Sequence, residues 1–186
     1  MRYQIGVIGS AEDFSPEVAD KARHVGRAIA DYNCTLITGA AIGLPYEAIL
    51  GARERRGLTI GIAPAMNEDE QLKKFKFKPD YFRNFDVMIY TGSGYKGRNV
   101  VNMRSCHGVV LVAGGIGSLN EVTTAYGEGK LIAVLKGTGG LADELENIFT
   151  KLRTKVGQGE VIYHTEPEEL VSKLVIKLNK TKKIPQ

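Results

Sequence analysis

The sequence contains no tryptophan and only two cysteines, Cys34 and Cys106, among its 186 residues. The spacing of these cysteines matches no zinc motif and no disulfide framework, so we expect no metal site and no cross-link. Runs of apolar residues stay far below the ~18 that a membrane span requires. A strand-like pattern begins directly after Met1, which leaves no room for a signal peptide. These absences predict a cytoplasmic protein with no membrane contact and no cofactor.

The sequence also has only a small excess of positive charge. Lys and Arg number 25 against 21 Asp and Glu, which gives a formal net charge of +4. Lys180, Lys182 and Lys183 lie in the last seven residues, which hold no acid, and without them the balance is 22 to 21. We interpret this pattern as a domain of residues 1–179 followed by a basic tail, 180–186, rather than as a nucleic-acid-binding surface.

Short apolar runs alternate with helical spacing along the whole chain. Apolar runs predict strands at 5–8, 34–38, 58–62, 86–90, 108–113, 131–135 and 160–163. Helical spacing predicts helices at 16–30, 45–56, 97–106, 118–126, 141–152 and 167–178, the first capped by Ser15. The stretch 66–85 is less regular and is interpreted as an excursion from the core. This alternation predicts a three-layer, Rossmann-like α/β fold with a mainly parallel sheet of six or seven strands.

Glycine, in contrast, is abundant, since its 22 residues make up about 12% of the chain against a typical ~7%. Glycine-rich loops follow four predicted strands, at 9–11, 39–43, 92–97 and 114–118. Ligands of open parallel sheets bind beyond the carboxyl ends of the strands, and helix N-termini there favour anions. Parallel sheets also need tight turns for structural reasons alone. We predict a phosphate or nucleotide site at Gly9, Ser10, Thr38, Gly39, Gly43, Gly114, Gly115, Gly117 and Ser118.

One glycine pattern is discounted. The stretch from Gly92 to Gly97 reads G-x-G-x-x-G, but it follows the fourth predicted strand and no acid lies about 20 residues further on. It is no Walker A loop either, because Arg98 and Asn99 follow where Lys and Ser or Thr are required. Neither a dinucleotide fingerprint nor a P-loop is therefore expected.

A more specific pattern joins the helix predicted at 97–106 to the loop after the next strand. Arg98 and Asn99 lie near the start of this helix, and the loop reads G-G-I-G-S-L-N-E from Gly114 to Glu121. The pattern resembles the Lonely-Guy (LOG) phosphoribohydrolases, also labelled lysine decarboxylase-like, whose signature is an Arg-Lys pair followed by P-G-G-x-G-T-x-x-E. The resemblance covers roughly residues 4–135.

This sequence departs from the LOG signature at several positions. Ala113 replaces the signature Pro, and Ser118 replaces the Thr. Asn120 stands where the family has another Glu directly before the signature Glu, and Asn99 replaces the Lys. The Leu44-Pro45 pair is closer to the molybdenum-cofactor carrier-like branch of the same superfamily. The resemblance to that branch leaves a non-catalytic carrier of a nucleotide or a molybdopterin-type cofactor as the alternative function.

The LOG resemblance implies hydrolysis of the N-glycosidic bond of an AMP-like nucleoside 5′-monophosphate, by a homodimer or a higher even oligomer. Glu121 would be the catalytic carboxylate, because it is the only acid in its loop and could stabilise positive charge on the ribose. Arg98 would hold the phosphate or Glu121. Alternatively, Ser118 and Glu121 form a capping box, and Arg98 is an ordinary surface charge.

Overall fold

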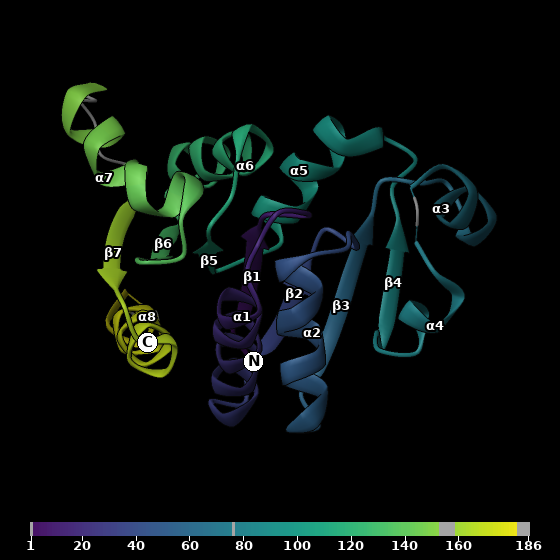
Figure 1. Ribbon diagram of the computed structural model, residues 1–186, viewed down its shortest axis with the longest axis horizontal. Coiled ribbons are helices and arrows are strands. Elements are labelled where there is room, and N and C mark those ends of the chain that lie inside the picture. Colours follow the sequence, from purple (N-terminus) through teal and green to yellow (C-terminus); the bar gives the residue numbers. More distant parts are fainter. Residues whose placement is uncertain (1, 76, 153–158, 182–186) are drawn as a thin grey trace, which may run out of the picture.

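The computed structural model describes residues 2–75, 77–152 and 159–181. Its centre is a sheet of seven strands in the order β4-β3-β2-β1-β5-β6-β7 (Figure 1). The strands are β1 (Gln4–Gly9), β2 (Thr35–Thr38), β3 (Leu58–Ala63), β4 (Val87–Tyr90), β5 (Gly108–Val112), β6 (Leu131–Leu135) and β7 (Glu160–His164). Each neighbouring pair is parallel. The predicted α/β class with a parallel sheet is confirmed.

Helices cover both faces of this sheet. In the described residues they are α1 (Pro16–Asp31), α2 (Leu44–Glu54), α3 (Glu68–Lys74), α4 (Pro79–Phe82), α5 (Gly94–Arg104), α6 (Ile116–Gly127), α7 (Gly140–Leu152) and α8 (Pro167–Thr181). Helices α1, α2 and α8 pack on one face, and α5, α6 and α7 on the other (Figure 1). None of these helices is long and apolar enough to cross a membrane.

The continuous apolar runs of the sequence follow from this double cover. Neighbouring residues of a strand point to opposite faces of the sheet. Val7 accordingly packs with the α1, α2 and α8 side chains, whereas Ile8 packs with those of α5, α6 and α7. Val110 and Leu111 divide in the same way. A strand between two helical layers therefore has both faces buried, so its sequence is a continuous apolar run rather than an alternation of apolar and polar residues.

Two helices begin earlier than the sequence predicts. The cap of α6 is Gly115, so Ser118 is the third residue of the helix, and the capping box of Ser118 with Glu121 was a wrong interpretation. Helix α5 begins at Gly94, so the second half of the discounted glycine motif is helical. The Ser15 cap of α1 is confirmed, because its side chain accepts the N–H of Val18.

The excursion between β3 and β4 contains α3 and α4. It is anchored by aromatic packing: the rings of Tyr46 on α2 and Tyr81 on α4 stack with centroids 4.3 Å apart. Phe77 and Phe85 are buried in the same group. At the C-terminus, α8 extends to Thr181, and the rest of the expected basic tail lies outside the described residues.

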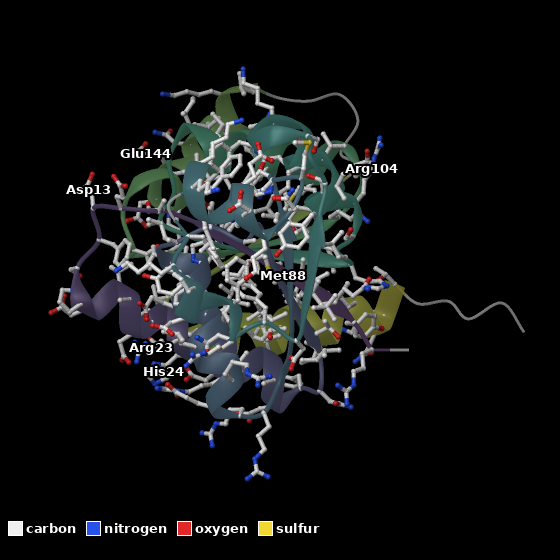
Figure 2. The ribbon with its side chains drawn as sticks, turned by 90° about the vertical axis from the view of Figure 1, so that its right-hand side faces the viewer. Asp13, Arg23, His24, Met88, Arg104 and Glu144 are labelled. Atoms are coloured by element: carbon white, nitrogen blue, oxygen red, sulfur yellow. The ribbon has the colours of Figure 1, made fainter. Side chains whose placement is uncertain are left out.

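Helices α1 and α2 approach each other closely at two glycines. A Cβ on Gly26 would lie 1.9 Å from the carbonyl oxygen of Ala48, and one on Gly51 would lie 2.0 Å from that of Arg23. Ion pairs border this contact, including one of 2.6 Å between Arg23 and Glu47. Figure 2 shows Arg23 and the neighbouring His24 at the outer side of α1. The two backbones can pack this tightly because both positions lack a side chain.

We expect Gly26→Ala to lower the free energy of unfolding by about 2 kcal/mol, measured by urea denaturation. Alanine favours a helix by about 1 kcal/mol relative to glycine, but here its methyl group would push two backbones apart. Gly127→Ala is the matched control, because a Cβ at this helical glycine meets no atom within 4 Å. Equal stability of the two variants would contradict the close-packing argument.

Candidate functional site

The order of the strands reverses between β1 and β5. Strands β2, β3 and β4 extend the sheet on one side of β1, and β5, β6 and β7 extend it on the other. Such a switch point opens a crevice at the carboxyl ends of the two central strands. A cavity of about 390 Å³ lies at this place. The predicted site residues that line it are Gly9, Ser10, Gly39, Arg98, Gly115, Gly117, Ser118 and Glu121.

The N-terminus of α6 forms one wall of the cavity. An ideal Cβ on Gly115 or Gly117 would meet no atom within 4 Å, so the backbone there faces open space. The first N–H groups of an α-helix have no acceptor inside the helix, and the helix dipole adds positive potential. This wall can therefore bind an anion such as a phosphate group.

Ser10 joins the glycine loops to one another. Its hydroxyl oxygen accepts the N–H of Gly114 at 2.9 Å, and its carbonyl oxygen accepts the N–H of Leu44 at 2.9 Å. Gly43 has a φ of 90° and lies so close to Ser10 that a Cβ would be 2.4 Å from that carbonyl oxygen. Gly43 and Gly114 thus shape the loops and do not line the cavity.

Thr38 lies behind the site rather than in its wall. The residue is fully buried, and its hydroxyl accepts the N–H of Ala40 at 3.3 Å. Gln71 of α3 donates to the carbonyl of Ala40 at 2.9 Å. Thr38 and Gln71 therefore hold the backbone of the loop after β2, and neither of them lines the cavity.

The loop after β5 has a conformation that the LOG signature excludes. Ala113 occupies the position of the signature proline with a φ of 51°, whereas the proline ring fixes φ near −65°. The N–H of Ala113, which proline would lack, donates to the Thr138 hydroxyl at 2.8 Å. The replacement of the signature proline by Ala113 therefore goes together with a loop conformation that proline could not adopt.

A buried ion pair lies beside the α6 wall. Nη1 of Arg98 on α5 donates to Oε1 of Glu121 on α6 at 3.2 Å, and Nδ2 of Asn102 donates to the same oxygen at 3.4 Å. The side chains of Arg98 and Glu121 are 6% and 11% exposed. Arg98 reaches this position because Gly39 has no side chain, since a Cβ there would be 1.8 Å from Nη1. Gly39 thus leaves the space that the guanidinium of Arg98 occupies in this pair.

Burial dominates the electrostatics of the pair. Desolvation raises the pKa of Glu121 and lowers the pKa of Arg98, because it disfavours both charged forms by more than their attraction and hydrogen bonds favour them. Two buried atoms nearby, Nε of Arg98 and Oδ1 of Asn102, have no hydrogen-bond partner among the described residues. The site therefore holds polar groups whose hydrogen-bonding capacity the described protein atoms leave partly unused.

Several cavity residues were not predicted from the sequence, among them two polar side chains of α5. Tyr95 and Asn99 line the cavity from the first turns of α5. The amide of Asn99 donates to the side-chain oxygen of Asn120 at 2.9 Å, so two departures from the LOG signature contact each other. The spacing of Tyr95, three residues before Arg98, is a signal only when the helix begins at Gly94, and the signal for Asn99 is its place at the signature Lys.

Several known proteins resemble this chain in sequence or in fold. A model of the SLOG cluster4 family matches residues 2–171. An uncharacterized protein of Archaeoglobus fulgidus is 34% identical over 72% of this chain and 80% of its own length. A cytokinin riboside 5′-monophosphate phosphoribohydrolase of Mycobacterium marinum is 28% identical over 70% of this chain and 65% of its own. The molybdenum cofactor carrier protein of Chlamydomonas reinhardtii superposes with a TM-score of 0.76 at 28% identity, over 97% of this chain and all of that chain.

We expect Gly115→Val to weaken binding of AMP at least about tenfold, measured by titration calorimetry. The backbone of Gly115 is extended, with a φ of −126°, so valine can adopt it, and its side chain would project into the cavity. The melting temperature should stay close to that of the original chain. Unchanged affinity in a folded variant would show that the phosphate binds elsewhere.

Proposed function

Because this chain belongs to the SLOG cluster4 family, near the molybdenum-cofactor carriers of the LOG-like superfamily, we propose that it binds a phosphorylated nucleotide or molybdopterin-type ligand. The observation that carries the proposal is the open glycine wall of α6 beside the buried pair of Arg98 and Glu121. The free N–H groups at the N-terminus of α6 would donate hydrogen bonds to the phosphate. The carboxylate and guanidinium would lie next to the sugar or its equivalent.

The first candidate reaction is hydrolysis of the N-glycosidic bond of a nucleoside 5′-monophosphate to a free base and ribose 5-phosphate. Its transition state carries positive charge on the ribose ring, which a nearby carboxylate stabilises. Both hydrogen bonds to Glu121 arrive at Oε1. Its Oε2 receives none from the described residues, so this oxygen is available to the ribose or to the attacking water.

Arg98 has a positioning role in this reaction. It is held between Gly39 and Glu121, so its guanidinium fixes the direction in which the carboxylate points. Its positive charge also opposes the protonation of Glu121 that burial favours. An ionised Glu121 is the form that stabilises a cationic ribose. The similarity to the phosphoribohydrolase of Mycobacterium marinum supports this candidate.

The second candidate is a carrier that binds its ligand without turnover. It is supported by the carrier protein of Chlamydomonas reinhardtii, which matches nearly the whole of this chain. It is also supported by the positive φ of Ala113 and by Asn120, because both separate this loop from the hydrolase signature. The two candidates share the site and differ in whether the bound ligand is cleaved.

Release of ribose 5-phosphate from a panel of nucleoside monophosphates separates the two candidates. For the hydrolase, Glu121→Gln should keep AMP binding within several-fold and lower turnover by about 10²-fold or more, the scale of one catalytic group. Turnover should also fall as the pH is lowered. Because burial raises the pKa of Glu121, this loss should begin at a higher pH than for an exposed glutamate.

Arg98→Ala should reduce both AMP affinity and turnover, because it leaves Glu121 buried without its partner. The Arg104→Ala variant is its control, since Arg104 ends the same helix at the surface (Figure 2), pairs with Glu128 and does not line the cavity. If no nucleoside monophosphate is cleaved while an intact nucleotide or pterin binds tightly, the carrier function replaces the hydrolase.

The functional unit that we propose is a homodimer or a higher even oligomer that associates through α5 and α6. Two apolar side chains on these helices face outward: Val101 is 40% exposed and Ile116 is 85% exposed. Ile116 lies between Gly115 and Gly117, so such an interface would adjoin the cavity.

Association should be visible by light scattering as a mass of a multiple of 20.3 kDa at micromolar concentration. Ile116→Asp should shift this mass toward the monomer, because an apolar interface would have to bury the new charge. Leu152→Asp is the control, since Leu152 is 67% exposed but lies at the end of α7. A monomeric mass for the original chain would contradict the oligomer.

A further inference from the structure

Tyr95 is an exposed aromatic residue in the wall of the cavity. It is the second residue of α5 and is 52% exposed, although it lines the same cavity as the buried Arg98 and Glu121. Half of a large ring is thus accessible to solvent beside the anion-binding wall. Neither the reaction chemistry nor the phosphate wall uses this ring.

The ring of Tyr95 is held in place from the excursion. Phe75, at the C-terminal end of α3, meets it edge to face with centroids 5.0 Å apart and planes at 85°. Helix α3 lies at the end of the sheet where α5 begins (Figure 1). Edge-to-face pairs favour a defined ring orientation. One contact therefore fixes the ring of Tyr95 while part of its surface stays accessible to solvent.

Helical spacing places Tyr95 in line with the charged part of the site. Tyr95, Arg98 and Asn102 lie at intervals of three and four residues, which is one face of a helix. Along this face an aromatic ring is followed by the guanidinium and then by the amide that contacts Glu121. Ile42 of the loop after β2 and Pro45 in the first turn of α2 add two apolar residues to the cavity.

We propose that Tyr95 is the stacking residue for the planar heterocycle of the ligand, and so a determinant of specificity that is separate from the phosphate wall. The inference rests on the proposed function, because it assumes a ligand that has both a phosphate and a ring. A purine base and a pterin share the required chemistry, a flat π face. The hydroxyl of Tyr95 has no part in this contact.

The absence of tryptophan from the chain gives a direct test. Tyr95→Trp introduces a single indole at the ring-binding position, and Tyr32→Trp introduces one at an exposed tyrosine at the C-terminal cap of α1, outside the cavity wall. AMP or 6-hydroxymethylpterin should quench the emission of the Tyr95→Trp variant and leave that of Tyr32→Trp unchanged. Ribose 5-phosphate should quench neither. Separate titrations with AMP and with the pterin show whether the stacked heterocycle is a purine base or a pterin.

Affinities measured by calorimetry complete the test. Tyr95→Ala should bind AMP about tenfold more weakly and ribose 5-phosphate as the original chain does, whereas Tyr95→Phe should bind both normally. AMP binding that survives in Tyr95→Ala, or is lost in Tyr95→Phe, overturns the stacking role and leaves the proposed function intact. An original chain that binds none of the three probes overturns the proposed function as well.

Discussion

The buried pair of Arg98 and Glu121 is the interaction on which the cavity depends. Removing a charge from water costs several kcal/mol, so either residue alone would be strongly unfavourable at this depth. The chain offsets the cost with Asn102 at the carboxylate and with Gly39, whose missing side chain leaves room for the guanidinium. Because the pair joins α5 to α6 and packs against Gly39 of the loop after β2, it also holds two walls of the cavity together next to a third.

The fold class could be predicted because double-covered parallel strands are continuous apolar runs, and β6 was predicted residue for residue at Leu131–Leu135. The first residues of α5 and α6 could not be predicted from the sequence. Both helices begin at a glycine or directly after one, without a side-chain cap, so Ser118 was the stronger local signal. The helices α3 and α4 are short, and tertiary contacts rather than periodicity hold them in place: Tyr81 of α4 stacks on Tyr46, and Gln71 of α3 donates to the carbonyl of Ala40.

The position of the cavity could be predicted because glycine loops mark the carboxyl ends of the strands. The structural role of each glycine could not be predicted, because the role depends on which atoms lie close to the glycine in space. Gly115 faces open cavity, Gly39 leaves room for Arg98, and Gly43 allows a positive φ. Tyr95 was missed for a related reason, since it lies one turn before Arg98 only when α5 begins at Gly94.

The departures from the LOG signature are coupled changes that leave the ion pair in place. Asn99 and Asn120 replace a Lys and a Glu, and they hydrogen bond to each other, so a neutral pair stands where the signature has opposite charges. Ala113 changes the loop geometry without moving Glu121 out of the cavity wall. The helix N-terminus and the carboxylate to which we assign phosphate binding and stabilisation of a cation therefore remain at one cavity. On this proposal, cleavage of the ligand depends on the access of a water molecule to Oε2 of Glu121, which a tightly stacked ring and a bound phosphate would control together.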